Sequence, residues 1–146
     1  MSRADELGRL EEQVAVLIRR VRRVIGERAR AVHPDLQPAS YLMLSHLVAS
    51  GPQRSSVLSE HFGVDKGAIS RQVQHLLDLG LLDREPDPAD GRASLVSASV
   101  DAVQRMEAVS RERRRWLDEG LSEWSEHELR EFVTGLSRYN SALDRG

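Results

Sequence analysis

The side chains best suited to chemistry lie on one predicted helix that begins after Asp65. Ile69, Val73 and Leu76 recur at helical spacing and define an apolar side, so the other positions form a polar side. That polar side holds Gly67, Arg71, Gln74 and Asp78, with Ser70 and His75 at its margins and Lys66 near the helix start. A small residue, a cation and an amide on one face are typical of a helix that reads base edges in a DNA major groove.

Each of these residue types has a defined role against duplex DNA. Arg71 can donate two hydrogen bonds to guanine, and Gln74 can pair with adenine in the same bidentate way. Gly67 lets the backbone approach closely, and Lys66 adds positive charge to a helix N-terminus, where phosphate binds well. His75 is equally consistent with a phosphate contact and with a plain surface position. Taken alone, the pattern also fits an ordinary amphipathic helix with a solvated polar face.

A second candidate contact follows the turn-rich segment Glu85 to Arg92. Asp90 and Gly91 permit a tight turn, so Arg92 can project from the tip of a loop. A narrow minor groove attracts such an arginine because of its negative potential. Asp90 can pair with Arg92 and hold its side chain in place. The alternative is a flexible acidic loop whose carboxylates repel phosphate.

Other chemistry finds little support. The chain has no cysteine, and its five histidines include no pair spaced for one helix face, so we predict no metal site. A glycine-rich phosphate loop and a nucleophile motif are both missing from the sequence, and we predict no catalytic residue and no cofactor. An enzyme is therefore not expected.

Glycine and proline divide the chain into the elements that must position these residues. Helices are predicted over 4–32, from Pro38 to before Gly51, over 57–62 and from Asp65 to Leu79. Ser55 or Ser56 can cap the short third helix, and Gly63 permits the sharp turn after it. Strands are predicted over 81–84 and 94–98, on either side of the loop at 85–92. Two more helices follow, capped by Ser99 and by a capping box of Ser125 with Glu128.

This order predicts a mainly α (α+β) fold, in which a helix-turn-helix is followed by a β-hairpin wing. The first helix carries a narrow apolar seam at alternating spacings of three and four, made of Leu7, Leu10, Val14, Leu17, Val21 and Val24. Such a seam indicates a helix that packs along a partner helix, here in a second subunit. The alternative is an ordinary amphipathic helix within one monomer. We expect residues 1–37 to form a dimerisation helix, 38–99 the DNA-binding lobe and 100–146 two C-terminal dimerisation helices.

Overall composition neither favours nucleic acid nor indicates a membrane. The net charge is −2, and residues 38–99 carry five basic and seven acidic side chains, so DNA contacts must depend on where charges lie. No apolar run approaches the roughly 20 residues of a membrane span, and the N-terminus lacks the pattern of a secretory signal. We therefore expect a cytoplasmic protein.

The stretches 58–73, 76–82 and 85–92 resemble the MarR family of bacterial transcriptional regulators, and the last ends in that family's Asp-x-Arg wing motif at Asp90 to Arg92. The resemblance implies a homodimer with intertwined terminal helices that binds a palindromic operator, usually as a repressor released by a small ligand. Positions that approach DNA in the family correspond here to Ser55, Ser56, Lys66, Gly67, Ser70, Arg71, Gln74 and Arg92. Two departures lie away from them: Ala102 stands where many members have glycine, and Gln37 replaces a usual threonine.

The same resemblance implies a ligand pocket that Tyr41, His46 and Trp116 could line. The alternative for these three residues is that they simply complete the core. At the level of the whole chain, the alternative to a DNA-binding regulator is a DNA-independent helical dimer that acts as a protein-interaction module.

Overall fold

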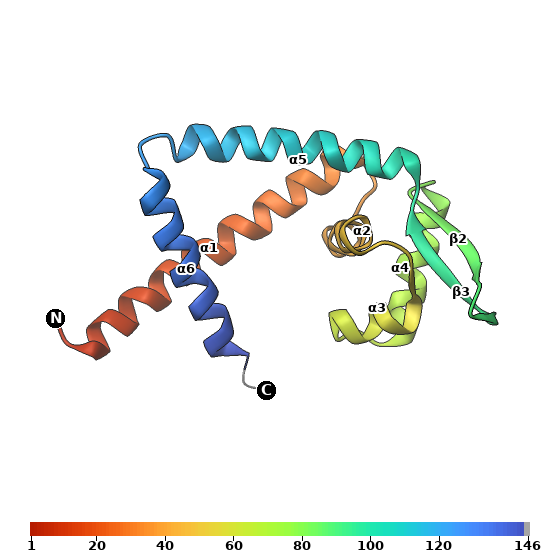
Figure 1. Ribbon diagram of the computed structural model, residues 1–146, viewed down its shortest axis with the longest axis horizontal. Helices are drawn as coiled ribbons and strands as arrows, with labels where there is room; N and C mark the ends of the chain where they lie inside the picture. Colours follow the sequence, from red (N-terminus) through yellow and green to blue (C-terminus); the bar gives the residue numbers. More distant parts are fainter. Residues whose placement is uncertain (145–146) are drawn as a thin grey trace. The chain divides into compact units, whose positions relative to one another are not determined.

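The computed structural model describes residues 1–144 as six helices and three short strands. In chain order these are α1 (Arg3–Val32), α2 (Pro38–Ser50), β1 (Gln53–Arg54), α3 (Ser55–Phe62), α4 (Lys66–Asp78), β2 (Leu82–Asp87), β3 (Asp90–Ala98), α5 (Val100–Gly120) and α6 (Glu126–Leu143) (Figure 1). Two compact units result, one from Met1 to Val109 and one from Ser110 onward. The mainly helical fold with a small wing sheet is the one that the sequence predicts.

One apolar core holds the first unit together. The predicted apolar side of α4 is confirmed, since Ile69, Val73 and Leu76 are all buried. They pack in a cluster with buried side chains from the end of α1, from α2, α3 and the sheet, and from the first turns of α5: Ala29, Val32, Leu36, Tyr41, Met43, Leu44, Leu47, Leu58, Leu81, Leu82, Val96, Ala102 and Met106. Burial on one side of α4 therefore fixes which of its side chains face solvent.

Local capping chemistry begins α2, α4 and α5, and ends α4, close to where the sequence predicts. Pro38 occupies the first turn of α2, and the Asp65 carboxylate accepts a hydrogen bond from the Ala68 N–H at 2.8 Å at the start of α4. Gly80 follows α4 with φ +74°, and the Leu81 N–H bonds to the Leu76 carbonyl at 2.9 Å, as in a Schellman motif. The Ser99 hydroxyl accepts from the Ala102 N–H at 3.1 Å and so caps α5.

The sheet has the order β1-β3-β2, and both pairs are antiparallel. Strand β1 was not predicted, because two residues are too few to show the alternation that marks a strand. It leads directly into α3, so Arg54, with extended backbone, occupies the N-cap position and α3 begins at Ser55. The prediction that Ser55 or Ser56 caps this helix is therefore wrong, and no side chain caps it.

The wing is more regular than predicted. Strand β2 extends to Asp87 and β3 begins at Asp90, so the turn between them is only Pro88 and Ala89 rather than the whole segment 85–92. Pro86 fits within β2 because this strand lies at the edge of the sheet. Gly91 belongs to β3 and does not have positive φ, so it does not make the turn as predicted.

Both ends of the chain leave large apolar side chains exposed. On α1 these include Leu7, Leu10, Leu17 and Val21 of the predicted seam, and in the second unit they are Trp116, Leu117, Trp124, Phe132, Val133, Leu136 and Leu143. From Ser110 to Asp144 no residue is buried in the single chain. None of the helices within residues 1–144 combines the length and apolar content needed to cross a membrane.

Candidate nucleic-acid interface

Helix α4 brings five of the predicted contact residues together on one solvent-exposed side. Lys66, Gly67, Ser70, Arg71 and Gln74 are all exposed, opposite the buried face of the helix. The helix is 13 residues long and begins with the Asp65 cap, so its N-terminal half presents a cation and open backbone. This is the arrangement that a recognition helix needs, because bases and phosphates meet its first turns.

The space above Gly67 is partly filled by two neighbouring side chains. A Cβ atom at this position would lie 3.2 Å from the Asp65 carboxylate and 3.5 Å from the nearest Arg71 guanidinium nitrogen. The cap and the cation that is predicted to read guanine therefore both lie over the bare backbone of Gly67. An alanine here would require the Asp65 carboxylate to shift by a few tenths of an ångström, whereas its distance to Arg71 is an ordinary van der Waals contact.

Asp78 orients the amide of Gln74. The Gln74 Nε2 donates a hydrogen bond to the Asp78 carboxylate at 2.9 Å. Because a carboxylate only accepts, the amide nitrogen must face Asp78, and this leaves the amide oxygen to face the other way. The sequence placed Asp78 on the polar side but gave it no role.

His75 has a structural contact that neither predicted alternative included. Its Nε2 donates to the backbone carbonyl of Asp35 at 3.1 Å, and the Asp35 N–H in turn donates to His33 Nδ1 at 3.0 Å. The side chain is half-buried. These bonds anchor α4 to the segment between α1 and α2.

The other predicted contact residues lie at the start of α3 and in the wing. Ser56 is exposed and Ser55 half-buried at the first turn of α3. Arg92 is exposed, but it lies on β3 rather than at a loop tip. Asp90 accepts a hydrogen bond from the Arg92 backbone N–H at 3.1 Å, so the bond seen is to the main chain and not to the guanidinium.

The wing contains an ion pair that the sequence does not predict. Arg54 Nε lies 2.6 Å and its Nη2 2.5 Å from Asp87 Oδ2, while Asp87 Oδ1 accepts from the Ala89 N–H at 2.9 Å. The Ala89 N–H and the Arg54 guanidinium hold the pKa of the Asp87 carboxyl below its ordinary value, against the opposing effect of burial. The two residues are 33 positions apart and Arg54 lies on the unpredicted strand, so no local pattern could reveal the pair.

The three residues predicted to line a ligand pocket lie in different surroundings. Tyr41 is buried in the core of the first unit. His46 shares a hydrogen bond of 3.1 Å with Gln53 and stacks on His61 at 3.9 Å between ring centroids. Trp116, in the second unit, is 61% exposed.

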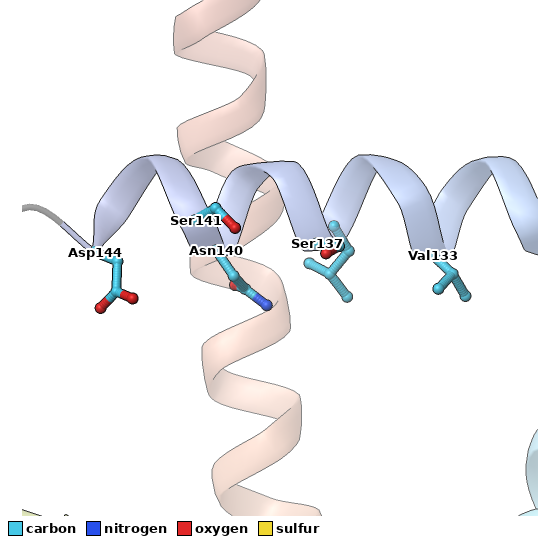
Figure 2. A pocket seen from close by; sticks show the side chains of 6 residues that line it. Val133, Ser137, Asn140, Ser141 and Asp144 are labelled. Atoms are coloured by element: carbon cyan, nitrogen blue, oxygen red, sulfur yellow. The ribbon is translucent and has the colours of Figure 1, made fainter.

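A shallow hollow that the sequence did not predict runs along one side of α6. Figure 2 shows its labelled side chains on a single helix. Its lining is Val133, Leu136, Ser137, Asn140, Ser141 and Asp144, all of them exposed. Because one helix lines it, the hollow is an open surface and not an enclosed binding site.

Comparison with known proteins agrees with this geometry. A family model described as the MarR family matches residues 35–93. The chain is 33% identical over 134 residues to the HTH-type transcriptional regulator YxaD of Bacillus subtilis, with 92% of each chain covered. Among solved structures, that of RV1404 from Mycobacterium tuberculosis superimposes with a TM-score of 0.80 at 20% identity, covering 99% of this chain and 97% of that one. Wild-type MarR from E. coli superimposes with a TM-score of 0.68 at 21% identity, covering 91% and 96%.

The match to YxaD extends over both units, and the family model covers most of the helix-turn-helix and the wing. The chain therefore belongs to the MarR family of DNA-binding, helix-turn-helix transcriptional regulators.

Proposed function

We propose that this regulator binds a palindromic DNA operator as a homodimer, with α4 in the major groove and the wing at the adjacent minor groove. The observation that carries the proposal is the exposed polar side of α4 opposite a fully buried face. The proposed contacts come from α3, α4 and the hairpin: Ser55, Ser56, Lys66, Gly67, Ser70, Arg71, Gln74, His75, Asp90 and Arg92. Of these, Arg71 and Gln74 read bases, and Arg92 binds the minor groove.

Two exposed apolar surfaces support a dimer: the seam of α1 and the large apolar side chains of the unit that begins at Ser110. An exposed apolar surface of this extent on one chain is a typical protein–protein interface. In the proposed division, residues 1–37 and 100–146 form the dimer and residues 38–99 bind DNA. Two lobes held at a fixed spacing then match the two half-sites of a palindrome.

Binding is tested by gel mobility shift on duplexes that the protein selects from random DNA. Phosphate contacts predict that the affinity falls steeply as salt rises. Arg92→Ala is expected to weaken binding to sites with A·T-rich flanks, whereas Arg71→Ala changes the preferred base at one position in each half-site, by roughly 1–3 kcal/mol. Arg3→Ala removes one exposed arginine at the start of α1 and serves as the charge-matched control. Failure of the wild-type protein to select any sequence at low salt would refute the proposal.

The dimer is tested by light scattering on the full chain. Leu17→Asp places a charge in the exposed seam and is expected to give monomers, which also lose binding to two half-sites. Ala15→Asp adds the same charge at an exposed position of α1 outside the seam and is the matched control. A Leu17→Asp protein that stays dimeric would show that the seam is not the interface.

The regulatory output that we propose is repression, relieved when a small ligand binds. This step rests on the family resemblance, and among the predicted ligand residues Trp116 is the one whose fluorescence can report on binding. A ligand that contacts Trp116 changes the tryptophan fluorescence of the Trp124→Phe protein and releases the selected duplex at the same concentration. A compound that releases DNA without changing this fluorescence binds elsewhere and removes Trp116 from the site.

A further inference from the structure

The pairing of Arg54 with Asp87 joins two strands that do not touch. In the sheet order β1-β3-β2, Arg54 ends one edge strand and Asp87 ends the other, with β3 between them. The register places Arg54 and Glu85 on opposite sides of Leu95, and Asp87 lies two residues beyond Glu85. The Arg54 side chain therefore reaches across β3 to the turn end of β2.

Both partners occupy positions next to proposed DNA contacts. Arg54 is the N-cap residue of α3, directly before Ser55 and Ser56. Asp87 pairs with Asp90 across the turn of the hairpin, and Asp90 lies two residues before Arg92. A bond between Arg54 and Asp87 thus connects the start of α3 with the end of the wing.

The Asp87 carboxylate is fully engaged. One oxygen accepts from Arg54 and the other from the Ala89 N–H, and the side chain is 9% exposed. The register of β2 on β3 shifts between Pro86 and Asp87, so the regular ladder of main-chain hydrogen bonds is interrupted just before Asp87. The bonds of the Asp87 side chain to Arg54 and Ala89 are a second means of fixing this end of β2.

We infer that Arg54 and Asp87 are positioning residues for DNA binding, which hold the wing at a fixed place relative to α3 so that Arg92 enters the minor groove. The pair also turns one carboxylate of an acidic hairpin away from phosphate and neutralises it. This inference rests on the proposed role of Arg92.

The alternative is that Arg54, whose side chain is 38% exposed, binds a phosphate directly. The two explanations predict opposite effects of Asp87→Asn, which keeps the shape of the side chain and its acceptor for Ala89. If Arg54 binds phosphate, removal of the carboxylate frees it and strengthens DNA binding. If the pair positions the wing, the same change weakens binding, although a negative charge has been removed from the interface.

The experiment measures affinity and hydroxyl-radical protection on the duplex selected by the wild-type protein. We expect Asp87→Asn and Arg54→Gln each to weaken binding about tenfold, within the range of coupled contacts. Protection of the minor-groove flanks is lost, while that of the major groove at α4 remains. Glu85→Gln, which removes an exposed acid from the same strand, is the matched control and is expected to bind as tightly as wild type or more tightly.

A second measurement separates positioning from general loss of structure. If Arg54 acts through Arg92, Arg54→Gln has no further effect in an Arg92→Ala background, whereas a direct phosphate contact gives additive losses. Thermal unfolding of each variant shows whether it is folded at the assay temperature, and if Arg54→Gln is not, the isosteric Asp87→Asn decides alone.

The inference is overturned if Asp87→Asn binds like Glu85→Gln, or if the Arg54 and Arg92 effects add. It fails separately from the proposed function, which is refuted only when the wild-type protein selects no DNA.

Discussion

Gly63, between α3 and α4, offers the sharpest test of how the sequence builds the helix-turn-helix. It ends α3 in the left-handed conformation, at φ +61° and ψ +34°. The turn is closed by the Val64 N–H, which bonds to the Ser59 carbonyl at 3.2 Å. A Cβ atom added to Gly63 would meet nothing within 4 Å, so the cost of an alanine here is conformational and not steric.

The expected magnitude follows from two opposing effects. The left-handed conformation costs an L-residue roughly 1–2 kcal/mol. Alanine also restricts the unfolded chain, which returns about 0.4–1 kcal/mol. Gly63→Ala should therefore lower the free energy of unfolding by about 1 kcal/mol, or the melting temperature by about 3–4 °C for a chain of this size. Gly63→Asn should cost less, because asparagine tolerates this conformation.

Thermal unfolding followed by circular dichroism, at one fixed protein concentration, measures the difference. Gly91→Ala is the matched control, since Gly91 is exposed, lacks positive φ and has open space around its Cα atom. It should leave the melting temperature unchanged or raise it slightly. Equal melting temperatures for the two alanine variants, or equal losses for Gly63→Ala and Gly63→Asn, would show that the left-handed conformation of Gly63 does not set the cost.

Four further predictions concern the cap, the core, pH and base preference. Asp65→Ala removes the hydrogen bond to the Ala68 N–H and should cost about 1 kcal/mol in urea unfolding, while Asp65→Ser retains most of the stability. Leu76→Ala empties a fully buried position and should cost about 2–5 kcal/mol, against far less for Leu42→Ala on the exposed side of α2. The pKa of Asp87 is lowered in the folded state, so its ionised carboxylate stabilises the fold at neutral pH, and this contribution is lost as pH falls through that pKa. The melting temperature of the wild-type protein should therefore fall below about pH 5, and Asp87→Asn should make that fall smaller. The part of the fall that is due to the lowered pKa of Asp5 should remain. Asp78→Ala frees the Gln74 amide, and selection from random DNA should show a weaker preference for adenine at its position, whereas an unchanged profile would contradict the orienting role of Asp78.

Much of the fold and of the α4 surface could be predicted because the signals are local. The apolar spacing of Ile69, Val73 and Leu76 identifies both the helix and its buried side, and a buried side determines the exposed one. Capping by Asp65 and the left-handed turn at Gly63 depend on a few neighbouring residues. The hairpin was predicted with the wrong boundaries, since Pro86 indicates a loop to any local rule and only an edge position in a sheet makes it acceptable within a strand.

The order of the helices and of the hairpin, the polar side of α4 and the position of Arg92 after a turn could all be predicted from the sequence, because periodicity and capping operate over a few residues. Which polar side chains of separate elements bond to one another depends on tertiary packing. Gln74 bonds to Asp78 within α4, but His75 bonds to the Asp35 carbonyl and Arg54 to Asp87. The last two contacts join segments 40 and 33 residues apart, and such pairs form only when the core has brought separate elements together. The net charge did not indicate the DNA-binding surface, because packing decides which charged side chains lie on that surface and a sum over the chain does not.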